Sequence, residues 1–118
     1  MKTIKIDGTD YPVLPRYSSL RRFCGKKGIE LNQFPEYLVE LFKGGVTNQF
    51  IDDITLLAYN FIERGLEQQG EAITLSMDDV LDWVMLPGNV NIVVELVNEA
   101  QGIDPKKIVK AQKKSSLK

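Results

Sequence analysis

Glycine and proline breaks constrain this chain most, because they divide its 118 residues into pieces of helix length. Glycine accepts the left-handed backbone that ends helices, and proline cannot continue a helix. Between the breaks, apolar residues recur at intervals of three and four, which is the spacing of one helix face. The pattern predicts five helices, over residues 17–27, 33–43, 47–69, 76–85 and 89–101.

The segment 47–69 is the longest of the five and has the widest apolar arc. Phe50, Ile54 and Phe61 form one stripe, and Ile62 extends it sideways. So wide an arc indicates a helix that is touched by neighbours on two sides. We therefore expect this segment to be the central helix of the fold.

The other helices each have one apolar face. Residue types that cap helix N-termini lie near the start of the first four helices. The candidate caps are Ser18 or Ser19 for the first helix, Asn32 for the second, Thr47 or Asn48 for the third, and Ser76 for the fourth. The predicted buried faces are Tyr17, Leu20, Phe23 and Cys24 in the first helix, Phe34, Tyr37, Leu38, Leu41 and Phe42 in the second, and Met77, Val80, Leu81, Val84 and Met85 in the fourth.

Residues 2–14 have the pattern of a β-hairpin rather than of a helix. Ile4 and Ile6 alternate with polar residues, and Asp7-Gly8 is a strong signal for a hairpin turn. The predicted fold class is mainly α: an N-terminal β-hairpin followed by about five helices packed in one small domain, residues 1–104. Residues 105–118 are predicted to be a basic, flexible tail.

Charge is distributed unevenly along the chain. All 16 acids lie at or before Asp104 and six of the 15 bases follow it, so residues 1–104 carry −7 and residues 105–118 carry +6. The lysines of this tail suit phosphate contacts, but no aromatic residues lie among them for base stacking. Nucleic-acid binding by this tail is therefore less favoured than a solvated tail or one that pairs with an acidic surface of another copy.

Several residue types that enzymes need are missing. The chain has no histidine, one cysteine (Cys24) and no glycine-rich phosphate loop, so we expect a binding protein, not an enzyme, with no cofactor and no metal. Cys24 is expected to be a buried, inert thiol. The acids Glu71, Asp78, Asp79 and Asp82 are expected to be a solvated helix start, because their spacing splays them apart. No apolar run approaches the roughly 20 residues of a membrane helix, so no membrane contact is expected.

Binding to another protein is expected to use apolar side chains. Trp83 lies off the predicted buried face of its helix, so it either caps the edge of the core or anchors a partner. If Met85, Leu86 and Val90 are exposed together with Trp83, they form an apolar patch. The candidate protein-binding residues are Trp83, Met85, Leu86, Val90, Phe42 and Tyr37.

Five stretches in a fixed order stand out in the chain: 2–13, 19–24, 28–31, 56–65 and 73–80. These are an opening hairpin, a first helix, the Gly28-Ile29-Glu30-Leu31 stretch, a long apolar helix, and a short extended link before an acidic helix start. Through these stretches the chain resembles the phage tail assembly chaperones, over roughly residues 2–100.

The resemblance implies a small, helical, non-enzymatic protein of a phage or prophage. Such proteins are made in the bacterial host cytoplasm and are absent from the finished virion. They bind and solubilise the tape measure protein, help to recruit the tail tube protein, and often form homo-oligomers. The alternative is a small cytoplasmic adaptor or regulatory domain that binds one folded partner.

Overall fold

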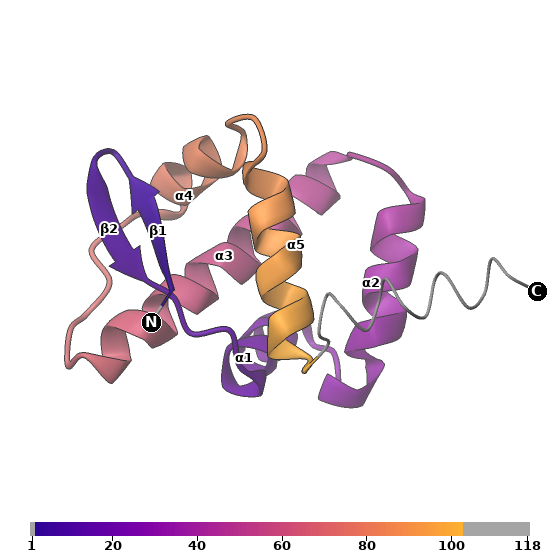
Figure 1. Ribbon diagram of the computed structural model, residues 1–118. Helices are drawn as coiled ribbons and strands as arrows, with labels where there is room; N and C mark the ends of the chain where they lie inside the picture. The colour runs from indigo at the N-terminus through magenta and orange to yellow at the C-terminus, as the bar shows by residue number, and fades with distance from the viewer. Residues whose placement is uncertain (1, 103–118) are drawn as a thin grey trace, which may run out of the picture.

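The computed structural model describes residues 2–102. Its elements are β1 (Thr3–Ile6), β2 (Thr9–Pro12), α1 (Tyr17–Lys27), the 3-10 turn η1 (Leu31–Gln33), α2 (Phe34–Lys43), α3 (Asn48–Gln68), α4 (Met77–Val84) and α5 (Asn89–Ala100). Within these residues, the mainly α fold with an N-terminal hairpin and five helices in one small domain is confirmed (Figure 1). The predicted tail, residues 105–118, lies outside the described residues.

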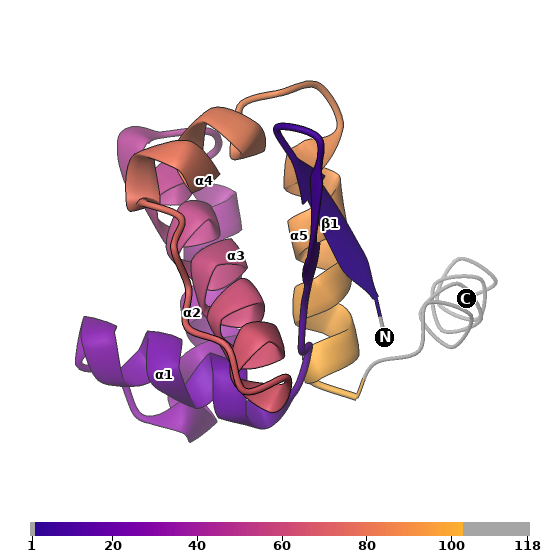
Figure 2. The ribbon, with the colours of Figure 1, turned by 90° about the vertical axis from the view of Figure 1, so that its left-hand side faces the viewer.

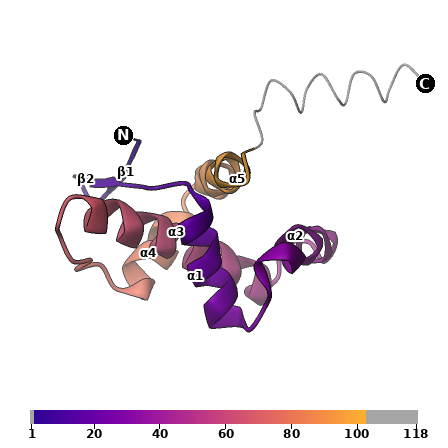
Figure 3. The same ribbon diagram turned by 90° about the horizontal axis from the view of Figure 1, so that it is seen from below.

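Helix α3 is the element on which the others assemble. It is 21 residues long and contacts α1, α2, α4, α5 and β2. The hairpin lies at one end of the molecule and α2 at the other, with α5 between them (Figures 1 and 3). The prediction of a central helix from the wide apolar arc is confirmed, because the arc is wide enough to bury against neighbours on several sides.

The hairpin forms as the sequence predicts. Asp7 and Gly8 both have positive φ, +50° and +80°, as a two-residue turn with the right twist requires. The strands pair antiparallel, and Ile4 and Ile6 are buried. Figure 2 shows the hairpin side by side with α5, where Lys2 Nζ lies 2.6 Å from a carboxylate oxygen of Glu99.

The end of β2 crosses α3 in direct backbone contact at Gly65. A Cβ atom at this position would lie 2.3 Å from the carbonyl oxygen of Pro12. Beside this contact, the Leu14 N–H donates a hydrogen bond of 3.0 Å to the Phe61 carbonyl. Only glycine lets the two backbones approach so closely, so Gly65 fixes the hairpin on α3.

Two of the predicted N-caps are confirmed. The Thr47 hydroxyl accepts a hydrogen bond from the Phe50 N–H at the start of α3. Ser76 and Asp79 form a reciprocal capping box at the start of α4, with distances of 3.1 and 3.0 Å. Asp79 is thus part of a helix start, as expected for this acidic group.

The other two predicted caps are wrong. The predicted cap of α1 is Ser18 or Ser19, but Arg16 occupies the N-cap position. The Ser19 hydroxyl donates instead a hydrogen bond of 2.6 Å to the Leu14 carbonyl. Asn32 does not cap α2, because the 3-10 turn η1 leads directly into that helix. At α2 the preceding turn replaces the free helix end that a side-chain cap would satisfy, whereas at α1 the N-cap residue makes no side-chain cap hydrogen bond.

The predicted buried face of α4 is confirmed at Val80 and Val84 and is wrong at Met77 and Met85. Met77 and Met85 are 40% and 59% exposed, and the buried residues are Val80, Trp83 and Val84. Met77 is the first residue of this eight-residue helix and Met85 is its C-cap, so both lie at its ends. Packing places Trp83 inside, on the flank of the Val80 and Val84 face opposite to Leu81, which is only partly buried.

An ion-pair cluster joins α1 to α3. Arg22 binds Glu63 at 2.8 Å and Glu67 at 2.7 Å, and Arg64 binds Glu67 at 2.9 Å. The hydrogen bonds from Arg22 and then Arg64 lower the pKa of Glu67 from 4.5 to about 2. Glu67 is partly exposed, so the cluster aligns the two helices more than it stabilises them.

Two glycines in helices allow a matched test of the crossing at Gly65. We expect Gly65→Ala to lower the free energy of unfolding by about 1–3 kcal/mol, because the added methyl group collides with backbone. Gly25 lies inside α1 with open space around it, so Gly25→Ala adds a methyl group without a collision. This substitution is expected to raise the free energy of unfolding by about 1 kcal/mol, because alanine has the higher helix propensity. Urea denaturation measures both, and equal effects would contradict the close contact.

The Glu67 cluster predicts a pH dependence of stability. A carboxylate whose pKa is lower in the folded than in the unfolded protein stabilises the fold at pH values above its pKa in the unfolded chain. This stabilisation is lost as the pH falls through its pKa in the folded protein. We expect the urea midpoint of Glu67→Gln to lie below that of the unchanged protein at pH 7. The difference is expected to shrink between about pH 4.5 and about pH 2. A difference that stays constant over this range would contradict the Arg22 and Arg64 contacts.

Candidate partner-binding groove

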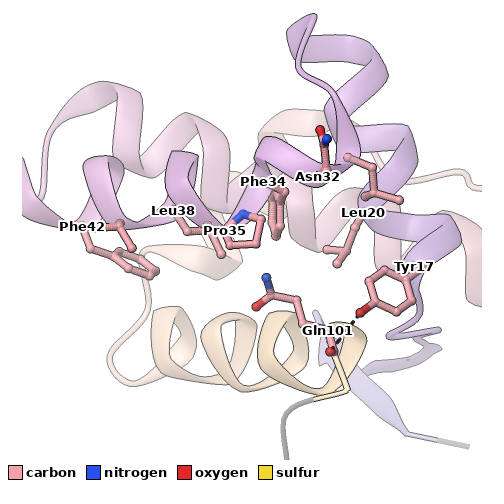
Figure 4. Close-up of a pocket in the computed structure, with 10 residues that line it drawn as sticks. Tyr17, Leu20, Asn32, Phe34, Pro35, Leu38, Phe42 and Gln101 are labelled. Atoms are coloured by element: carbon pink, nitrogen blue, oxygen red, sulfur yellow. Dashed lines mark hydrogen bonds between the residues drawn. The ribbon is translucent and has the colours of Figure 1, made fainter.

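An apolar groove of about 710 Å³ opens between α2 and the C-terminal end of α5. Figure 4 shows its lining side chains, with α2 on one side and α5 on the other. The lining comprises Tyr17, Leu20, Leu31, Asn32, Phe34, Pro35, Leu38, Val39, Phe42 and Gln101. We call this feature the apolar groove.

Helix α2 forms one wall of the apolar groove because it carries two apolar stripes. Its core stripe is Phe34, Leu38 and Leu41, which are buried. A second stripe, Pro35, Val39 and Phe42, follows the helix at intervals of four and three residues and lines the apolar groove. A helix with both stripes cannot bury all of its apolar surface against α3 alone.

The floor of the apolar groove is part of the core, and its rim is exposed. Leu20 and Phe34 are 0% and 1% exposed, so the floor is rigidly packed. At one end, the Tyr17 hydroxyl donates a 3.1 Å hydrogen bond to the Gln101 carbonyl (Figure 4). This bond ties α1 to the end of α5 and closes that end of the apolar groove.

The C-terminal end of α5 lies opposite α2 (Figure 4). Gln101, the C-cap of α5, lines the apolar groove. Ile92 and Glu95 of α5 lie beside Lys2 and Ile4 of the hairpin segment instead. The apolar groove therefore lies between α2 and the end of α5, and both helices pack on α3.

Exposed apolar side chains concentrate at this site. Four of the nine large hydrophobic side chains that are exposed within residues 2–102 line the apolar groove. They are Tyr17 (57% exposed), Leu31 (36%), Val39 (53%) and Phe42 (42%). Single exposed hydrophobic residues are ordinary on protein surfaces, but a group gathered around a concave site marks a binding surface.

A buried polar cluster holds α2 on α3. The carboxylate of Asp53 in α3 is 1% exposed and accepts a hydrogen bond from the Tyr37 hydroxyl. Lys27 Nζ lies 2.9 Å from the other oxygen of Asp53. Burial first, and then the bond to Asp53, raises the pKa of Tyr37, and the bond to Asp53 raises the pKa of Lys27. Tyr37, predicted to bind a partner, thus faces α3 and positions the wall of the apolar groove.

The remaining predicted binding residues lie in different environments. Phe42 lines the apolar groove, and Val90 packs partly buried against the core. Met85 and Leu86 are 59% and 56% exposed beside the α4–α5 turn. Trp83 is 6% exposed, so it belongs to the core and does not join an exposed patch with its neighbours.

Of the four exposed hydrophobic residues that line the apolar groove, the sequence predicts only Phe42 as a binding residue. Its pattern places Tyr17 on the buried face of α1 and gives Leu31 and Val39 no site. The signal for Val39 was present, because Pro35, Val39 and Phe42 have helical spacing. Leu31 and Tyr17 gave no such signal, since their position depends on how η1 and α1 meet.

The reactive side chains lie apart from the apolar groove lining. Cys24 is 2% exposed, which confirms the predicted buried thiol, and burial raises the pKa of that thiol. No three acidic or cysteine side chains within residues 2–102 are grouped so that they could hold a metal ion. In the same residues no single helix is long and apolar enough to cross a membrane, although α4 and α5 together pass that test while bent by 107°.

Comparison with known proteins gave no relative: no family model, no curated protein and no solved structure matches this chain.

The cluster at Asp53 predicts a specific loss of stability. Asp53→Ala leaves the Tyr37 hydroxyl and the Lys27 ammonium without their buried acceptor, so we expect the free energy of unfolding to fall by about 1–3 kcal/mol. Asp52→Ala is the matched control, because the adjacent carboxylate is exposed, and is expected to change this quantity by less than about 0.5 kcal/mol. Urea denaturation of both variants measures the difference in the free energy of unfolding, and equal losses would contradict the role given to Asp53.

Proposed function

We propose that this protein is a non-enzymatic phage or prophage tail assembly chaperone that binds an apolar helical segment of the tape measure protein. The observation that supports this proposal is the apolar groove, which joins a rigid floor to an exposed rim. The sequence resemblance supplies the identity of the partner. Aid to tail tube assembly, action in the host cytoplasm and absence from the finished virion belong to the same proposal.

The dimensions of the apolar groove favour a helical ligand. Its α2 wall extends from Phe34 to Phe42, which corresponds to about 12 Å or two helical turns. An amphipathic helix in such a groove anchors through side chains spaced three, four and seven residues apart. A long helical client offers many segments of this kind, so several copies of the protein can cover one client.

The mechanism that follows is mass action. A segment held in the apolar groove is withdrawn from the pool that aggregates, and the fraction of segments held rises with the free concentration of this protein. The site needs no reacting group, only apolar surface of the right shape. Release follows when tube subunits compete for the same client segment.

A second candidate function is an adaptor or regulatory domain with one folded partner. Met85 and Leu86 favour it, because both are more than half exposed beside the tight Pro87-Gly88 turn. Apolar residues on a short turn contact a folded surface more readily than they enclose a segment of a client.

The two surfaces are compared by placing one carboxylate on each. We expect Val39→Glu to weaken binding of the cognate tape measure protein at least about tenfold, because the charge enters an apolar groove. Met85→Glu is the matched control, since its side chain is similarly exposed, and binding is expected to change less than about twofold. Calorimetric titration with tape measure segments measures the affinities.

Co-expression provides the corresponding cellular test. The unchanged protein and Met85→Glu are expected to keep the tape measure protein in the soluble fraction, and Val39→Glu is not. Loss of binding in Met85→Glu alone would favour the adaptor function. Unchanged solubility of the client with and without this protein would overturn the chaperone proposal.

A further inference from the structure

The segment 103–118 begins at one end of the apolar groove. Gln101 lines the apolar groove, its carbonyl is fixed by the Tyr17 hydroxyl at 3.1 Å, and Gly102 follows with φ of +75°. The last described residues therefore place the start of this segment beside the apolar groove, at the end where Tyr17 and Gln101 meet. We propose that residues 103–118 of the same chain occupy the apolar groove when no partner is bound, with Ile108 against the wall that contains Val39.

The length of the segment suits this placement. Ile108 follows Gln101 by seven residues, which span about 10 Å as a helix and at most about 23 Å when extended. The α2 wall, from Phe34 to Phe42, is about 12 Å long. The extended length exceeds the length of the wall, so the chain is long enough for Ile108 and Val109 to reach Val39 and Phe42.

The segment has apolar residues that can cover the exposed rim of the apolar groove, and a net charge opposite to that of residues 2–102. It carries Ile103, Ile108, Val109 and Leu117 among six lysines and one acid. Its net charge is +5, and that of residues 2–102 is −6, so the two parts attract each other. The apolar residues cover the exposed rim of the apolar groove, and the lysines remain in water.

The covalent link favours this occupant over a second copy. A short tether gives a segment an effective concentration of about 1 mM or more at its own site. The same segment of another molecule competes only at the total protein concentration. A partner must displace the segment. The apparent affinity of that partner is therefore its intrinsic affinity multiplied by the fraction of sites that are free.

Cysteine pairs test the placement in the full chain. We expect Val39→Cys combined with Ile108→Cys to form a disulfide within one molecule about tenfold faster than Glu40→Cys combined with Ile108→Cys. Glu40 is the matched control because it is next to Val39 on α2 and lines a different hollow, with Tyr37. Non-reducing electrophoresis and peptide mapping identify the bond, and circular dichroism verifies that both variants fold.

The outcomes separate this inference from the proposed function. Equal rates for the two pairs, or disulfides only between two molecules, would overturn the inference. As a second measurement, Ile108→Lys combined with Val109→Lys is expected to raise binding of the dye anilinonaphthalene sulfonate at least threefold, and unchanged dye binding would overturn it as well. Neither readout uses a client, so a failed tape measure titration leaves the inference standing.

Discussion

Burial of α3 on several sides is the constraint on which the rest of the structure depends. A helix with so wide an apolar arc is stable only when neighbours cover it along its whole length. The hairpin covers it near Gly65, α2 covers it near Asp53, and α4 and α5 lie between. Because α2 and α5 both pack on α3 and hardly on each other, the described residues leave the apolar groove open between them.

The apolar groove also explains why α2 needs a polar attachment. A helix with apolar side chains on two faces has no strong preference for which face turns inward. The bond from Tyr37 to the buried Asp53, together with Lys27, selects one orientation and leaves Val39 and Phe42 outward. Buried polar contacts of this kind specify an arrangement more than they stabilise it. The cluster thus relates the stability of the fold to the shape of the candidate site.

Local signals in the sequence predicted much of the fold, and contacts between distant residues decided the rest. The turn at Asp7-Gly8 and the caps at Thr47 and Ser76 depend on neighbours within four residues, so their residue types were sufficient. The burial of Trp83 depends on how the short helix α4 packs against its neighbours, so it could not be derived from the spacing of apolar residues. Similarly, the helical pattern places both Phe42 and Tyr17 on buried faces, and both are exposed at the apolar groove; only Phe42 is also predicted as a binding residue.

The sequence by itself determined the element types, their order, the central place of α3 and the absence of histidine chemistry. These follow from periodicity, glycine breaks and composition, which act over short distances along the chain. Only the tertiary structure decided that Phe42, predicted on the buried face of α2, is exposed, and that Tyr17 and Gln101 meet at the end of a groove. The physical reason is that hydrophobic burial is nondirectional, so a helix with two apolar stripes takes its orientation from its neighbours.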